Sequence, residues 1–264
     1  MTNRVEKKFR TLKKVKKKAF IAFLTAGYPT LKATEDLVLA FEKSGVDIIE
    51  LGVPFSDPLA DGPTIQASSQ YALKKGVTLK KILNLVADIR RKSEIPILLM
   101  TYYNPIFQLG EEQFAKQARR CGVDGVIVPD LPVEEAGNLL KAAKRNRLAS
   151  VFFVAPTTTK ERMKKILKST SGFVYYVSLT GVTGARRALP ADVVRDVRRI
   201  KSTTDKPVCV GFGISTPAQI KGLAKTADGI IVGSVLIKEI QKHLNQRNLV
   251  VRTAKFVARL AKNL

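Results

Sequence analysis

The sequence predicts an α/β protein, a single (β/α)8 barrel of the TIM-barrel type with an extra N-terminal helix. Eight short runs rich in β-branched residues recur along the chain, a stretch of helical periodicity follows each, and 264 residues suit an undivided barrel. Parallel strands need a crossover of a dozen or more residues, usually a helix, so this alternation indicates a parallel sheet. An open doubly wound sheet is the alternative, but no GxGxxG follows the first run, which leads into TAGYPT.

The expected elements follow one another without a linker, so the domain is expected to span 1–264. Residues 1–18 are expected to form a basic N-terminal helix, and 19–264 the barrel. The expected strands are AFIAFL (19–24), VDIIEL (46–51), IPILLMT (95–101), VDGVIV (123–128), ASVFFV (149–154), FVYYVS (173–178), PVCVGF (207–212) and DGIIVG (228–233). In this fold the chemistry lies at the C-terminal ends of the strands.

Composition predicts a soluble globular protein without a membrane span. Hydrophobic residues make up 45% of the chain, and no apolar run approaches the roughly 18 residues that a spanning helix needs. The basic start followed by AFIAFLTAG imitates a secretory signal, but the apolar part is short, no small-x-small cleavage site follows, and it makes a good first strand. The protein is therefore expected in the cytoplasm.

The net charge of +24 raises the question of a nucleic-acid or membrane partner. The lysines and arginines are spread over nearly every helical segment, as solvated faces usually are. Aromatic residues do not interleave with them, and no nucleic-acid-binding motif is present. We expect no specific nucleic acid and no membrane among the partners.

Cysteine and histidine patterns point to no metal site. Cys121 and Cys209 stand alone without a CxxC, which predicts buried, reduced thiols. The single histidine, His243, lies in the helical pattern IKEIQKHLNQ and is expected to be a solvated helix residue. Neither a metal nor an organic cofactor is expected.

The stretch ELGVPFSDPLADG (50–62) carries three carboxylates directly after the apolar run VDII of the second expected strand. Side chains alternate along a strand, so Val46, Ile48 and Glu50 share one face. If that face points into the barrel, Glu50 lies above an apolar stack at the catalytic end, where burial raises its pKa as a general acid requires. If it points outward, Glu50 pairs with a lysine of the helix layer.

The two aspartates of this stretch have two interpretations. Asp-Pro and Asp-Gly are ordinary turn formers, so Asp57 and Asp61 could do no more than cap the local backbone. Three prolines nevertheless hold the loop at little entropic cost, which suits a second acidic group that faces Glu50 across a substrate.

Glycine-rich turns end the last three expected strands. They read LTGVTGAR (179–186), GFGIST (211–216) and VGSVLIK (232–238). Glycines expose backbone N–H groups, and GSVLIKEI opens a helix whose N-terminus favours an anion. In TIM barrels, phosphate sites are frequent after strands seven and eight, so the sequence predicts a phosphate site here.

The segments FLTAGYPT, ELGVPFSDPLADGPTIQ, MTYYNPIF, GVDGVIVPDLPVEEA, YYVSLTGVTGAR and GFGIST resemble the tryptophan synthase alpha chain family, in order and over the whole length. The resemblance implies a barrel that cleaves indole-3-glycerol phosphate into indole and glyceraldehyde 3-phosphate without metal or organic cofactor. It also implies a β chain that receives the indole, in an α2β2 assembly. A lyase without a β partner and a catalytically silent activating subunit are the alternatives. The basic charge departs from what the family leads us to expect.

The resemblance assigns residues to roles by their motifs. Glu50 and Asp61 match the family's catalytic pair. Phe23, Tyr102, Tyr175, Thr183 and Phe212 match its substrate positions, and Thr183 belongs to a loop that closes over the site. Gly184, Gly213, Gly233 and Ser234 match its phosphate cradle. Pro54, Asp57, Asn104, Phe107, Asp130 and Pro132 match positions that meet the β chain.

Overall fold

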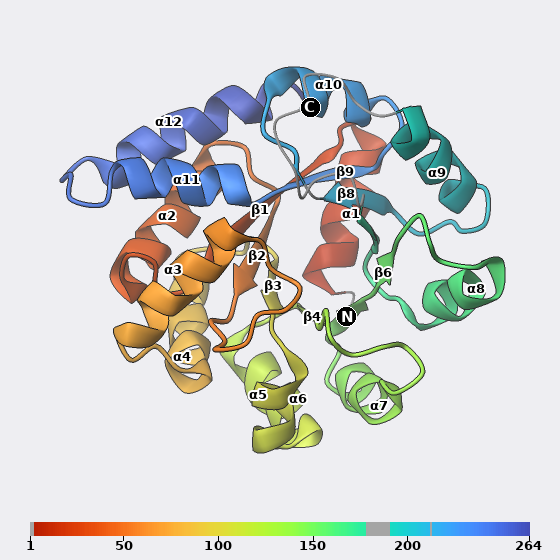
Figure 1. Cartoon of the computed structure of the whole chain (residues 1–264), viewed down its shortest axis with the longest axis horizontal. Coiled ribbons are helices and arrows are strands. Elements are labelled where there is room, and N and C mark those ends of the chain that lie inside the picture. Colours follow the sequence, from red (N-terminus) through yellow and green to blue (C-terminus); the bar gives the residue numbers. More distant parts are fainter. Residues whose placement is uncertain (1–2, 178–190, 212) are drawn as a thin grey trace.

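A parallel barrel surrounded by helices forms the structure, a computed structural model that describes residues 3–177, 191–211 and 213–264 (Figure 1). The strands are β1 Ala19–Thr25, β2 Ile48–Gly52, β3 Ile97–Met100, β4 Gly125–Ile127, β5 Ala149–Val151, β6 Phe153–Val154, β7 Val174–Val177, β8 Val208–Gly211 and β9 Gly229–Val232. All paired strands are parallel, in the order β5-β4-β3-β2-β1-β9-β8-β7-β6. The predicted fold class is confirmed.

Twelve helices are present in the described part of the chain, and most of them form a ring outside the strands (Figure 1). They are α1 Arg4–Lys14, α2 Leu31–Lys43, α3 Pro63–Lys74, α4 Leu79–Arg90, α5 Tyr103–Leu109, α6 Glu111–Cys121, α7 Gly137–Arg145, α8 Lys160–Ser169, α9 Ala191–Lys201, α10 Pro217–Ala224, α11 Ser234–Lys242 and α12 Leu249–Ala261. Thr30, Thr78, Thr159 and Thr216 cap four of them through side-chain oxygens.

The expected strand 149–154 is divided into β5 and β6, and this division closes the barrel. β5 pairs with β4 on one side, whereas β6 pairs with β7 on the other. The intervening Phe152 carbonyl accepts a hydrogen bond from Tyr175 N at 3.1 Å. One continuous segment therefore joins the two ends of the sheet, although its pairing changes partner midway.

Two apolar layers lie on opposite faces of the strands. The interior layer contains Ile21, Ile48, Leu98 and Ile231, and the outer layer lies between the strands and the helices. Val46 belongs to the outer layer, so the expectation that it shares a face with Ile48 is wrong. Strand β2 begins only at Ile48, and the regular alternation of side chains begins there too.

Helix α1 closes the N-terminal end of the barrel, at the centre of the ring in Figure 1. Its buried residues Val5, Phe9 and Leu12 join the interior layer, and the Phe9 ring lies 5.7 Å from that of Phe173. The Asn3 side chain accepts a hydrogen bond from Val5 N at 2.8 Å and so caps the helix. The predicted N-terminal helix thus covers the interior apolar layer at the N-terminal end of the barrel.

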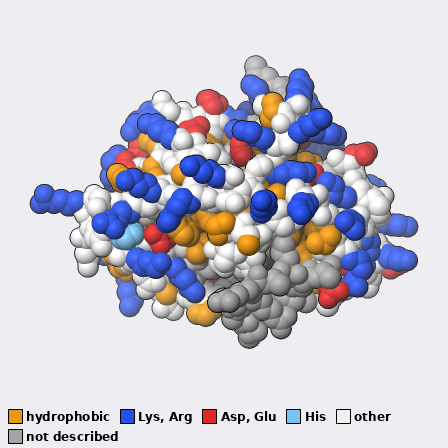
Figure 2. All heavy atoms as spheres, turned by 90° about the horizontal axis from the view of Figure 1, so that it is seen from above, with side chains coloured by type: hydrophobic (Ala, Val, Ile, Leu, Met, Phe, Trp, Pro, Cys, Tyr) orange, Lys and Arg blue, Asp and Glu red, His pale blue; other side chains and the backbone are white. Residues whose placement is uncertain are grey.

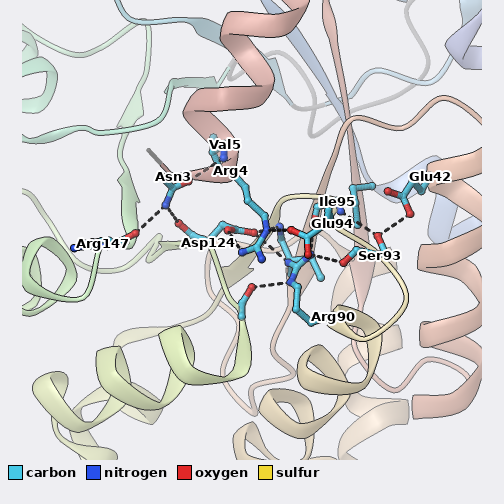
Figure 3. Close-up of polar contacts among 12 residues, drawn as sticks. Asn3, Arg4, Val5, Glu42, Arg90, Ser93, Glu94, Ile95, Asp124 and Arg147 are labelled. Atoms are coloured by element: carbon cyan, nitrogen blue, oxygen red, sulfur yellow. Dashed lines mark hydrogen bonds and ion pairs between the residues drawn. The ribbon is translucent and has the colours of Figure 1, made fainter. Parts of the chain in front are cut away.

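Polar contacts fix α1 to the strand ends, as Figure 3 shows. The buried Asp124 carboxylate accepts hydrogen bonds from Arg4 and Arg90, each at 3.1 Å. Ile97 N donates to it at 3.0 Å, and Asn3 donates to the Asp124 carbonyl at 2.6 Å. Removing a partner weakens the compensation of this buried charge, so the cluster favours a single position of the helix.

The surface is basic on the face that Figure 2 shows, with lysines and arginines scattered between apolar and acidic side chains. Many carboxylates on the surface are already paired, as Glu112 is with Lys116 and Arg145. No helix in the described ranges is long and apolar enough to cross a membrane.

Candidate active site

The Glu50 side chain is enclosed at the C-terminal end of β2. It is 1% exposed, and its backbone is in register with Phe23 of β1 and Leu98 of β3. Ile48 lies in the interior layer, so Glu50, two residues on along the strand, is directed to the same side. The inward orientation considered from the sequence is therefore the observed one.

The environment of Glu50 favours a protonated carboxyl group at neutral pH. Burial, and then the negative charge of Asp61, raise its pKa from 4.5 to about 8. Its Oε2 atom is buried and has no hydrogen-bond partner among the described residues. A carboxyl oxygen without a partner is free to exchange a proton with a substrate.

Asp61 follows in the loop between β2 and α3, where a tyrosine holds its carboxylate. The Tyr102 hydroxyl donates to Asp61 Oδ2 at 3.2 Å and accepts from Ala60 N at 2.9 Å. Burial raises the pKa of Asp61 to about 6, and the Tyr102 hydrogen bond works against that rise. Asp61 therefore ionises at lower pH than Glu50.

Phe55 is a residue of this site that the sequence interpretation did not identify. Its ring stacks on Tyr102 with centroids 5.0 Å apart and an angle of 21° between the planes. Tyr102 is buried between this ring and the loop, and burial raises the pKa of its phenol. Spacing along the sequence offers no signal for this contact, because the two residues lie in loops after different strands.

Aromatic side chains form the wall beside Glu50. Phe23 and Tyr175 are both almost fully buried, and burial, with the nearby charge of Glu50, raises the pKa of the Tyr175 phenol well above its usual value. A Cβ atom at Gly211 would lie 2.5 Å from the Tyr175 hydroxyl. Only glycine therefore leaves room for this tyrosine inside the barrel.

The start of α11 lies next to that wall. Gly233 is the N-cap residue of α11, and a Cβ atom there would lie 3.4 Å from the Cβ of Phe23. Ser234 is the first helical residue and is exposed. The first N–H groups of a helix have no partner within it and favour an anion. Gly213 adopts a positive φ of 70° in the loop after β8, another position that favours glycine.

Three predicted site residues, Thr183, Gly184 and Phe212, lie outside the described residues.

The six positions predicted to meet a partner lie in the loops after β2, β3 and β4. Asp57, Asn104, Phe107, Asp130 and Pro132 are exposed, whereas Pro54 is buried. The Phe107 side chain is 64% exposed, and Leu59, which was not predicted, is 92% exposed. Asp130 also accepts a hydrogen bond from Tyr103 N at the start of α5, so it has a structural role as well.

The cysteines and the histidine differ in part from expectation. Cys209 is buried and Cys121 only half-buried, at the last turn of α6, and neither forms a disulfide. The His243 side chain is only 13% exposed, less than expected for a solvated residue, and its Nε2 lies 3.4 Å from Glu239 Oε1. No group of three or more metal-ligating side chains occurs within the ranges that the structure describes.

A parallel barrel with two buried carboxyl groups of different pKa and an aromatic wall at the C-terminal ends of its strands is typical of a barrel enzyme that uses acid–base chemistry. Residues 9–264 match the family model "Tryptophan synthase alpha chain". The chain is 53% identical to the tryptophan synthase alpha chain of Geotalea daltonii over 90% of each chain. It belongs to the tryptophan synthase alpha chain family, as predicted.

Solved structures support the same assignment. Tryptophan synthase subunit alpha from Legionella pneumophila superposes with a TM-score of 0.93 at 36% identity, over 100% of this chain and 98% of that one. A chain of the tryptophan synthase complex from Pyrococcus furiosus gives a TM-score of 0.83 at 39% identity, over 93% of this chain and 97% of that one.

Proposed function

We propose that the chain cleaves indole-3-glycerol phosphate to indole and glyceraldehyde 3-phosphate, with Glu50 as the group that transfers protons and Asp61 as the group that stabilises charge. The chain is a lyase, the alpha subunit of a tryptophan synthase, and the alternatives of a stand-alone lyase and a silent subunit are not favoured. One observation carries the assignment of roles: the enclosed Glu50 carboxyl group has a pKa of about 8 and an Oε2 atom without a hydrogen-bond partner among the described residues.

Cleavage of the bond between the ring and the glycerol chain needs an electron acceptor. Protonation of ring carbon C3 by Glu50 makes the ring that acceptor, because the positive charge then spreads to the ring nitrogen. The electrons of the breaking carbon–carbon bond return to the ring and release indole. The glycerol hydroxyl loses its proton as the aldehyde forms, and the Glu50 carboxylate, now ionised, accepts it. Protons balance, and the catalyst returns to its starting state.

Asp61 acts on the other side of the ring. As a carboxylate it accepts a hydrogen bond from the ring N–H and stabilises the positive charge that develops there. The two carboxyl groups need different protonation states at one pH, and pKa values of about 8 and about 6 supply them near neutrality. Tyr102, assigned by resemblance to the substrate, acts instead by positioning Asp61.

The remaining assignments rest on the rim residues that the structure describes and, for Thr183, Gly184 and Phe212, on the family resemblance alone. We place the substrate ring against Phe23 and Tyr175 and its phosphate at Gly213, Gly233 and Ser234, with Thr183, Gly184 and Phe212 completing the site. The β chain, which receives the indole, docks on Phe107, Leu59 and the neighbouring predicted positions. We also place the enzyme in the cytoplasm, which suits its two free cysteines.

Indole release from indole-3-glycerol phosphate tests the function directly. The purified chain should release indole alone, and faster when the β chain is added. Glucose 6-phosphate isomerisation serves as a control for unrelated sugar-phosphate chemistry and should give no product. A chain that releases no indole under either condition would refute the proposal.

A further inference from the structure

Helices α8 and α9 are neighbours in the outer ring (Figure 1). Residues of α8, of α9 and of the segment after α9 line a cavity on the outside of the barrel. Its volume is about 470 Å³, within the range of small-molecule sites. It is lined by Lys160, Met163, Lys164, Leu167, Lys168, Arg199, Thr203 and Thr204. None of these residues belongs to the active site described above, so the reaction does not explain them.

The lining of this cavity has an apolar floor and a cationic rim. Met163 and Leu167 are buried and form the floor. Lys160, Lys164 and Lys168 are exposed and follow one another at intervals of four residues, so they lie along one face of α8, about 6 Å apart. Within the described residues these three lysines form no ion pair, and the lining contains no carboxylate.

Arg199 supplies the second observation, which is independent of the shape of the cavity. Its Nε and Nη2 atoms are buried, and in the described part of the chain neither has a hydrogen-bond partner. These two donors form the side of the guanidinium that binds an oxyanion through two parallel hydrogen bonds. Buried donors without a hydrogen-bond partner destabilise the protein, and hydrogen bonds to an oxyanion ligand would offset this cost.

Neighbouring acidic groups do not fill this role. Asp196 lies one turn before Arg199 on α9, but its Oδ2 accepts the Tyr176 hydroxyl at 2.8 Å. Its Oδ1 lies 3.8 Å from Arg195 Nε. Both Asp196 oxygens thus lie near other groups, and among the described residues the Nε and Nη2 atoms of Arg199 remain without a partner.

We propose that the cavity between α8 and α9 binds a small organic polyanion. One oxyanion group lies side-on against Arg199, the apolar part of the ligand covers Met163 and Leu167, and further negative charges face the lysines of α8. A concave site of this size suits a small molecule better than a nucleic-acid duplex, which needs an extended positive surface. Phosphate and carboxylate groups both satisfy this chemistry, and the test separates them.

Calorimetric titration of the full-length chain with inorganic pyrophosphate, and separately with citrate, tests the proposal at low ionic strength. Arg199→Gln and Lys164→Gln should weaken binding of the preferred anion at least tenfold. The matched controls are Arg198→Gln and Lys165→Gln, which change the same charge on adjacent residues that do not line the cavity. The controls should change affinity less than threefold. The anion that binds more tightly identifies the ligand group.

Melting temperature gives a second measurement that separates binding from folding. The preferred anion should raise the melting temperature of the wild type and of Arg198→Gln but not that of Arg199→Gln. Indole release should be unchanged in all four variants, because the cavity is not part of the active site. Equal weakening in all four variants would show a general charge effect and overturn the proposal, as would the absence of binding by either anion.

Discussion

At the scale of single residues, the Asp61–Tyr102 contact shows how a positioning group sets a protonation state. Replacing Tyr102 by Phe removes the hydroxyl that donates to Asp61 and accepts from Ala60 N. The pKa of Asp61 should rise, so the acidic limb of the pH–rate profile should shift to higher pH, and kcat should fall about tenfold. Tyr103→Phe, which removes a hydroxyl bonded to Glu111 outside the site, is the matched control. An unshifted profile in Tyr102→Phe would contradict this role.

Glu50 should also make stability depend on pH. Its unfolded pKa is 4.5 and its folded pKa about 8, so between these values the folded state binds more protons. Stability therefore falls as pH rises through this window, by up to about 1.4 kcal/mol per pH unit for one group. The glutamine in Glu50→Gln does not titrate. The free energy of unfolding of the variant, measured in urea, should therefore rise relative to that of the wild type from pH 5 to pH 8. A difference that stays constant with pH would mean that Glu50 has an ordinary pKa.

Sequence reasoning could identify the carboxylate pair but not its support. Glu50 was predictable because a strand has a period of two and its end is the catalytic end of the barrel. Tyr102 contacts both Asp61 and Phe55, but it follows β3 whereas they follow β2. The two loops come into contact only when the barrel has formed.

At the scale of elements, the sequence predicted every strand of the barrel, and the differences lie at strand ends. Val46 sits outside because β2 starts two residues later than its apolar run does. The run 149–154 becomes two strands because its neighbours pair with different halves of it. The apolar content of a segment predicts that it is buried. The residues at which a strand begins and ends depend on hydrogen bonds to neighbouring strands, and the sequence of one segment does not specify those.

Helix α1 should contribute strongly to stability through Phe9. That side chain is 7% exposed beneath the interior layer, so Phe9→Ala should lower the free energy of unfolding by about 3–5 kcal/mol. Phe107→Ala makes the same change at a site that is 64% exposed and should cost less than about 0.5 kcal/mol. Urea unfolding of both variants measures the difference. Equal losses would mean that α1 does not contribute to the core.

At the scale of the whole molecule, exposed residues of the loops after β2 and β3 should carry the contact with the β chain. The double variant Asp57→Ala, Phe107→Ala should keep its fold and its own indole release while its affinity for the β chain falls at least tenfold. Lys116→Ala with Glu112→Ala, a surface pair on α6, is the control. Unchanged affinity in the rim variant, measured by calorimetry, would remove these loops from the interface.

The central claim is that Glu50 moves the proton that starts cleavage, and single-turnover cleavage of indole-3-glycerol phosphate tests it most directly. Glu50→Gln should still bind the substrate but lose nearly all cleavage, because an amide keeps the shape and cannot transfer the proton. Asp61→Asn should be severely impaired but retain more activity, since its amide oxygen still accepts the ring N–H bond. A Glu50→Gln enzyme that cleaves at near wild-type rate would contradict the mechanism, and the reverse order of the two variants would exchange their roles.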